Sequence, residues 1–309
     1  MSATHDLTAA EQTVWIGAVE QQFQTQLVLG DNFFYHRNLQ GSWDTLFPVI
    51  GRQQMRHEAD GVNRMTGSGS SENPTEQSLQ LQVDLPLKGD QQIPYSEQSA
   101  YGFDVNGVYS EALARGAVAD RQYCVMAQAA EYATTQGNIN TAYNLINESA
   151  DLTEEVVMLL SNMSAQFTQL KTPNDNMRFA CLWPHGYAAL ARSPLVSSRD
   201  FNVRNQGTDV IKPYLYYQGW IISTIDLLFG SDNSAATRFA SKYRHDGTNT
   251  KAIFWWKNAV VIGDVMAPEY NVIDVEHYDT YLAKARQHFG TGVIPGHGDA
   301  VWIAQGTAA

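Results

Sequence analysis

A run of ten residues with strictly alternating side chains constrains the fold of this chain more than any other feature. Leucine or valine occupies every second position over residues 79–87, and glutamine, aspartate and proline lie between them. A period of two is typical of a β-strand with one apolar face. We therefore expect a strand over residues 79–88 that must bury this face against another part of the structure.

The residues before this strand predict its partner. Residues 61–77 are dense in Gly, Ser, Asn and Pro, which indicates a long flexible loop, and the apolar segment 46–55 precedes that loop. Pairing of 46–55 with 79–88 forms a long two-stranded hairpin. Because an isolated hairpin is only marginally stable in water, such an arm needs a partner surface.

A long helix is expected after the hairpin. Over residues 110–134, apolar side chains recur at offsets of four and seven without an internal proline, which is typical of one buried helix face. At 1.5 Å per residue, roughly 22 residues span about 33 Å, enough for the spine of a domain. Gly137 is expected to end this helix, because glycine readily adopts the left-handed conformation found there.

A second helix and several strands complete the pattern. Apolar residues from Leu152 to Leu170 form one helix face, and Asp151 and Glu154 have the spacing of an N-cap residue and its third-position partner. The resulting fold class is mixed α+β. Further strands are expected at 179–183, 220–229, 253–262, 270–275 and 293–304, with a short helix opened by Pro184 at 184–191.

Composition favours a globular protein without a membrane-spanning helix. Apolar residues make up 44% and aromatics 11% of 309 residues, a length that fits one large or two modest domains. The apolar stretches 214–225 and 253–263 are too short to span a bilayer, and the N-terminus lacks a secretory pattern, so we expect a cytosolic start. Cys124 and Cys181 lie far apart in apolar segments, which predicts two buried thiols.

The charge balance argues against tight binding of nucleic acid. The chain has 20 Lys plus Arg and 32 Asp plus Glu, and its net charge of −12 repels phosphates overall. Aromatic clusters can stack on bases, but such platforms carry interleaved basic residues, and only Lys212 and Lys257 lie near the clusters here. We therefore expect core or subunit-interface packing for Tyr214, Tyr216, Tyr217, Phe254, Trp255 and Trp256.

No catalytic, cofactor-binding or metal-ligating residue is predicted. The sequence lacks the glycine-rich phosphate loops, the HExxH motif and the GxSxG elbow, and the acid pair Glu154 and Glu155 suits a helix start. The tempting residue is His297 in the sequence IPGHGD, because a PGHG turn supplies one metal ligand in metallo-β-lactamase-like hydrolases. Since the HxHxDH cluster of those enzymes is absent, a plain β-turn is favoured.

The order of these elements resembles that of the major capsid proteins of tailed bacteriophages. The family's N-arm, E-loop, spine helix, A-domain and P-domain correspond to an N-terminal arm, a long hairpin, a long helix, a mixed lobe and a β-rich return. Short segments are also similar to podovirus-type coat proteins: LFPVIGR at 46–52, the strand region 79–93, the helix with Asp120, and the closing segment 287–303. The resemblance implies a structural protein without catalysis or cofactors.

The resemblance also implies a division of the chain. The hairpin would reach over a neighbouring subunit, and the A-domain would lie near the local symmetry axes. Some relatives join subunits covalently through an E-loop lysine. Here Lys88 is the one lysine in 52–90 and falls in a predicted strand, so we expect a shell without crosslinks. The implied parts are an N-arm at 1–45, the E-loop hairpin at 46–98, the spine-helix part of the P-domain at 99–136, the A-domain at 137–254 and the P-domain return at 255–309.

The implied function is a coat protein whose hexamers and pentamers close into an icosahedral head. The shell would enclose double-stranded DNA without sequence-specific binding, assemble in the host cytoplasm with scaffolding, portal and decoration proteins, and remain in the virion. Two alternatives stay open. An encapsulin-like compartment protein resembles the same fold but encloses cargo enzymes, whereas a soluble metal-dependent hydrolase would use His297 and work as a monomer or small oligomer.

Overall fold

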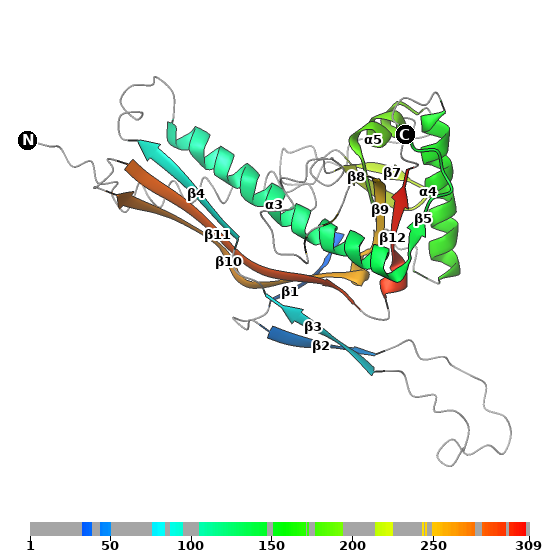
Figure 1. Ribbon diagram of the computed structural model, residues 1–309, viewed down its shortest axis with the longest axis horizontal. Helices are drawn as coiled ribbons and strands as arrows, with labels where there is room; N and C mark the ends of the chain where they lie inside the picture. Colours follow the sequence, from blue (N-terminus) through cyan, green and yellow to red (C-terminus); the bar gives the residue numbers. More distant parts are fainter. Residues whose placement is uncertain are drawn as a thin grey trace, which may run out of the picture.

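The computed structural model shows two β-sheets, one long helix and a separate hairpin (Figure 1). The long helix extends from one end of the molecule to the other. One end holds a four-stranded sheet, and the other end holds a six-stranded sheet and two shorter helices. The structure describes residues 33–38, 44–50, 76–83, 87–94, 105–146, 151–170, 172, 177–193, 214–224, 243, 245, 249–275, 280–294 and 297–306.

Helix α3 (Val105–Gln136) confirms the predicted long helix and extends it to 32 residues. Its end also follows the prediction, because Gly137 has a φ of +75°. The Gly137 N–H donates to the Thr134 carbonyl (3.1 Å), and the Asn138 N–H donates to the Ala133 carbonyl (2.9 Å). This pair of bonds is the Schellman motif, which satisfies carbonyls that the helix itself leaves without partners.

The four-stranded sheet has the order β1-β10-β11-β4, and α3 lies along one of its faces (Figure 1). The β10–β11 and β11–β4 pairs are antiparallel, whereas β1 runs parallel to β10. Register shifts on either side of Met266 interrupt the β10–β11 ladder, which marks β-bulges there. The strands are β1 (Tyr35–Asn38), β4 (Leu87–Pro94), β10 (Val260–Val275) and β11 (Thr280–Val293).

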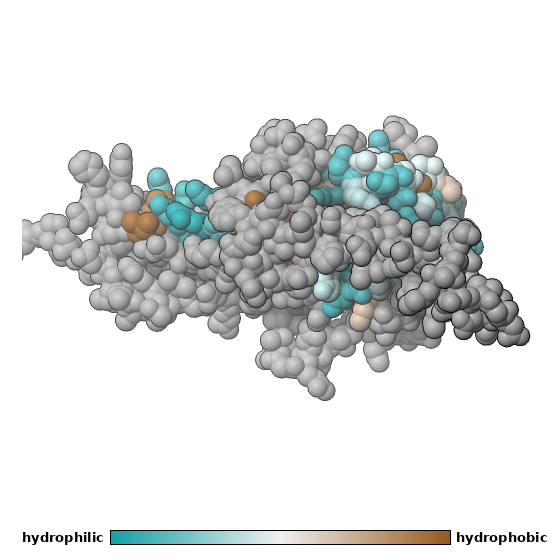
Figure 2. All heavy atoms as spheres, turned by 90° about the horizontal axis from the view of Figure 1, so that it is seen from below, coloured by the Kyte–Doolittle hydropathy of each residue, from teal (hydrophilic) through white to brown (hydrophobic). Residues whose placement is uncertain are grey.

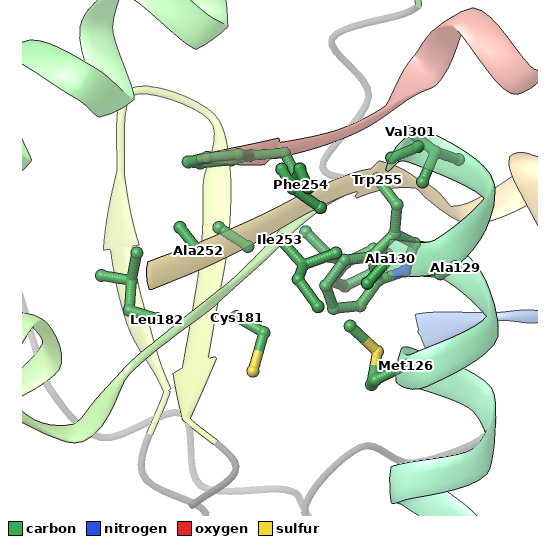
Figure 3. Close-up of a cluster of buried hydrophobic side chains, with 14 of the residues drawn as sticks. Met126, Ala129, Ala130, Cys181, Leu182, Ala252, Ile253, Phe254, Trp255 and Val301 are labelled. Atoms are coloured by element: carbon green, nitrogen blue, oxygen red, sulfur yellow. The ribbon is translucent and has the colours of Figure 1, made fainter. Parts of the chain in front are cut away.

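The six-stranded sheet has the order β5-β12-β9-β6-β8-β7 and carries most of the buried core. Figure 3 shows side chains from α3, β6, β9 and β12 meeting in one apolar cluster, among them Met126, Cys181 and Trp255. Helices α4 (Leu152–Gln169) and α5 (Pro184–Arg192) belong to this end of the molecule. The strands are β5 (Ile139–Asn140), β6 (Arg178–Leu182), β7 (Leu215–Tyr217), β8 (Trp220–Thr224), β9 (Thr250–Trp256) and β12 (Val301–Gln305).

Strands β2 (Asp44–Ile50) and β3 (Glu76–Gln82) pair antiparallel, which confirms the predicted hairpin where it is described. Phe47 lies opposite Leu79 in this register. The alternating segment is nevertheless not one strand, because β3 ends at Gln82 and Leu87 begins β4 in another sheet. The sequence between them includes Pro86, which has no N–H to donate to a continuous ladder.

Other boundaries also differ from the sequence expectations. The run 253–262 is divided by the 3-10 turn η4 (Lys257–Ala259), and the run 293–304 by the 3-10 turn η6 (Gly298–Ala300). The expected strand 270–275 is the end of the 16-residue β10. Asp151 is the N-cap residue of α4, as predicted, but its side chain makes no capping hydrogen bond, so the expected pairing with Glu154 as a capping box is wrong.

Several predictions are confirmed in this part of the fold. The predicted apolar face of α4 is buried except for Leu170, which is 40% exposed. Pro184 opens α5, and Cys124 and Cys181 are buried free thiols. Of the predicted loop 61–77, residues 76 and 77 belong to β3, whereas residues 61–75 and the expected strand residues 225–229 lie outside the described residues; so does the short helical stretch that the sequence indicates at 11–28.

Candidate assembly surfaces

His297 lies in a β-turn, as predicted. Its N–H donates to the Ile294 carbonyl (3.1 Å), the bond that closes a β-turn. The imidazole ring stands edge-on to Trp256, with centroids 5.3 Å apart, and burial lowers its pKa. Among the residues that the structure describes, no group of three or more His, Cys, Asp or Glu side chains is placed to hold a metal ion.

The aromatic residues near the middle of β9 serve packing, as predicted. Phe254 and Trp255 are fully buried, and the Trp255 indole N–H donates to the Phe33 carbonyl (3.0 Å). The Trp255 ring also stacks against Phe34 and Phe179, at centroid distances of 5.7 Å each. These rings are therefore not available to nucleic-acid bases.

The hairpin β2–β3 lies outside both sheets and meets the rest of the protein near one end (Figure 1). There Leu81, which is 1% exposed, forms a small apolar cluster with Val261, Val265 and Ile294, and Val83 packs against it. The cluster fixes the base of the hairpin on the face of the four-stranded sheet that carries Val261. Two strands joined only to each other are marginal by themselves, which makes this hairpin an element expected to gain stability from another surface.

An ion pair fixes the long helix to the sheet. Arg121 of α3 donates two hydrogen bonds to the Asp264 carboxylate of β10, from Nη1 to Oδ1 (2.9 Å) and from Nη2 to Oδ2 (3.0 Å). The guanidinium also lies over the Phe289 ring, 5.1 Å from its centroid. Gln287 of β11 adds a bond from Nε2 to the Ala117 carbonyl (2.9 Å). Sequence reasoning missed this pair, because its members are 143 residues apart and have no local signal.

The register divides the β11 side chains between two faces. Phe289 and Gln287 contact α3, and a Cβ added at Gly89 of β4, which pairs with Ala285, would lie 3.4 Å from Leu113 of α3. Since successive side chains alternate, the even-numbered residues 282–286 point away from the helix.

We call the charged residues of this second face, Lys88, Asp90, Lys284 and Arg286, the outer sheet patch. Lys88, Asp90 and Arg286 are exposed, Lys284 is half-buried, and Ile273 is 39% exposed. Figure 2 shows polar residues and an apolar spot gathered at the same end of the molecule, on its left. Lys88 thus lies in a strand, as predicted, with its side chain at the surface.

No protein-family model matches the sequence, and no curated protein matches it either. Solved structures do match, and they define the class of fold: the chain has the fold of tailed-phage capsid proteins, as the resemblance implied.

The capsid of the cyanophage P-SCSP1u superimposes with a TM-score of 0.66 and 18% identity over 90% of this chain and 87% of that chain. The capsid of Ralstonia phage GP4 gives a TM-score of 0.58 and 11% identity over 91% and 88% of the two chains. A virus-like particle from Pyrococcus furiosus gives a TM-score of 0.55 and 11% identity over 95% of this chain and 98% of that chain. The likeness therefore extends over nearly the full length of each chain.

None of the helices in the described part of this chain has the length and apolar character that a membrane span requires.

Proposed function

We propose that this chain is a major capsid protein, which self-assembles into the icosahedral head of a tailed bacteriophage and encloses the packaged DNA. The observation that carries the proposal is a capsid fold over nearly the whole chain, with a two-stranded arm outside the main body. A closed shell consists of many copies of one contact, and an arm that is stabilised by a neighbour supplies such a contact.

The role that follows is structural. Hexamers and pentamers of the chain form the shell, and scaffolding, portal and decoration proteins are its partners during assembly in the host cytoplasm. The protein has no catalytic residue, cofactor or metal in this role. Its net charge of −12 suits a container that encloses double-stranded DNA without holding its phosphates tightly, so that the DNA moves freely while it is packaged.

The proposed division keeps the family's parts. Residues 1–45 form the N-arm, 46–98 the E-loop hairpin, and 99–136 the spine-helix part of the P-domain. Residues 137–254 form the A-domain, and 255–309 return to the P-domain. Strand β12 of the return pairs with β9, so the last strand lies in the six-stranded sheet and ties these two parts together.

An encapsulin-like compartment shell is the second candidate, because the virus-like particle from Pyrococcus furiosus has the same fold. The two functions differ in what the shell encloses. Mass spectrometry and nucleic-acid assays on purified native particles separate them: long double-stranded DNA supports the phage head, and a stoichiometric cargo protein without DNA supports the compartment.

We also propose that the mature shell has no covalent crosslinks. Lys88, the one lysine in 52–90, lies in β4 within a ladder to β11. Denaturing electrophoresis of mature particles should show a single band near the chain mass of 34.3 kDa. A ladder of linked chains would overturn this proposal.

The test of the proposed arm replaces residues 52–74 with a short Gly-Asn turn and leaves β2 and β3 intact. Because the apolar cluster around Leu81 is retained, we expect the shortened subunit to keep its circular dichroism spectrum and its thermal midpoint. Sedimentation velocity should show particles for the full chain and only small species for the shortened chain. Equal assembly of both chains would show that the arm is not an assembly element.

A further inference from the structure

The outer sheet patch contains an arrangement that an isolated subunit does not favour. Lys88 of β4 lies directly opposite Arg286 of β11 in the antiparallel ladder, and both side chains are exposed. In the next row on the same face, Asp90 lies opposite Lys284. Opposite charges across a ladder stabilise a sheet, whereas like charges directly opposite one another destabilise it.

Among the side chains that the structure describes, Asp90 does not balance the cations of the patch. On its other side the backbone of Arg286 is in register with Glu269 of β10, and the side chains that the structure describes in the two rows are three cations and one carboxylate. The whole chain has the opposite balance, with 20 cationic and 32 acidic residues. A local excess of cations is therefore complementary to the surface that another copy presents on average.

Apolar residues beside the cations indicate a protein partner. In the row that follows Asp90, Leu282 lies opposite Ile273, whose side chain is 39% exposed. Phosphate binding would gain nothing from an exposed isoleucine, and Asp90 within the patch would repel a polyanion. A protein surface with carboxylates around an apolar contact matches all of these features, because protein interfaces combine an apolar centre with a charged rim.

The geometry points to the outer sheet patch as a contact between copies of this chain, in which Lys88, Lys284 and Arg286 bind carboxylates of a second copy. The inference rests on the proposed function, which requires such contacts. It explains why a like-charged pair is present on a surface strand, because the carboxylates of the neighbouring copy offset the repulsion within one subunit. Stability given up at a functional surface is a common feature of proteins.

The first test uses one substitution that should weaken particle assembly without lowering the stability of the unassembled subunit. In Arg286→Gln, the repulsion of Lys88 is removed, so the thermal midpoint of the unassembled subunit should stay the same or rise. The critical concentration for particle formation, measured by light scattering at low salt, should rise about three- to fivefold, the effect of one lost exposed ion pair per subunit. The difference from the unmodified chain should shrink as salt is raised, because salt screens exposed charges.

A matched control removes a cation elsewhere. Lys257 lies in η4, outside the patch, and Lys257→Gln changes the net charge by the same amount. We expect its critical concentration to equal that of the unmodified chain. If both variants weaken assembly equally, the effect comes from net charge and the patch is not a contact. If Arg286→Gln assembles normally while the unmodified chain forms particles, the inference fails and the proposed function stands.

The second test identifies the partner carboxylates directly. Particles assembled from a mixture of ¹⁴N- and ¹⁵N-labelled chains are treated with a carbodiimide, which joins a lysine amine to a carboxylate in contact with it. We expect mixed-isotope peptides that link Lys88 or Lys284 to an acidic residue of another copy. Links from these lysines only within one chain, such as Lys284 to Asp90, would overturn the inference. A chain that forms no particles under any condition would contradict the proposed function itself.

Discussion

Removal of the Asp264 carboxylate should destabilise the subunit strongly. The Asp264→Ala substitution leaves the Arg121 guanidinium, whose side chain is 9% exposed, without its two charge-assisted bonds of 2.9 and 3.0 Å. Breaking a buried ion pair from one side costs about 3–5 kcal/mol. Because the Asp264 side chain is itself 24% exposed, we expect about 2–4 kcal/mol.

Urea unfolding of the unassembled subunit, followed by tryptophan fluorescence, measures this loss, since Trp255 is fully buried in the core. As a control, Glu154→Ala removes an exposed carboxylate at the start of α4 and should cost less than about 1 kcal/mol. The double variant Arg121→Met with Asp264→Leu should lose less than either single truncation, because no charge stays buried alone. A loss below about 1 kcal/mol for Asp264→Ala would show that the pair does not fix α3 to the sheet.

Substitutions at four positions test the local geometry. Gly298→Ala should lower stability by about 1–3 kcal/mol in thermal unfolding, because the added Cβ would overlap the Tyr132 ring. Gly116→Ala should raise stability by about 0.5–1 kcal/mol, because Gly116 lies on α3 with open space beside it and alanine favours a helix. Gln218→Asn should raise the unfolding midpoint slightly, because Gln218 has a φ of 45° in the turn between β7 and β8 and asparagine tolerates that conformation better; an unchanged or lower midpoint would contradict this reasoning. Burial raises the pKa of Tyr214, with a further contribution from Tyr216, so the stability from its neutral form is present below about pH 10 and is lost as the pH rises beyond it. Tyr214→Phe should therefore lose less stability than the unmodified chain when denaturation is measured between about pH 10 and 11, and identical losses would refute the assignment.

Elements whose apolar residues recur with a clear period can be predicted from the sequence. Strands that bury polar side chains cannot be predicted in this way. Helix α3 was expected because its apolar residues recur along one face, and the end at Gly137 follows from the conformational freedom of glycine. Strand β11 gave no such signal. Its helix-facing positions include Gln287 and Thr291, which are buried although they are polar. A strand of this kind does not show the alternation of apolar and polar residues by which strands are recognised.

The candidate surfaces were predictable only in part. The hairpin follows from the local pattern of 79–82 and the loop before it, but its register does not: the structure pairs 44–50 with 76–82, whereas the expected segments were 46–55 and 79–88. The outer sheet patch does not follow, because it joins Lys88 of one strand to Arg286 of a strand almost 200 residues later. That pairing depends on the topology β10-β11-β4, which no local sequence signal specifies.

Negative-stain electron microscopy of the purified chain shows whether this protein forms a shell. The chain is expressed alone, and a second sample adds a scaffolding protein if the neighbouring genes encode one. We expect closed particles or sheets of hexamers in at least one of the two samples. Small discrete oligomers in both samples, at concentrations where related shells form, would contradict the proposal that this chain builds a capsid.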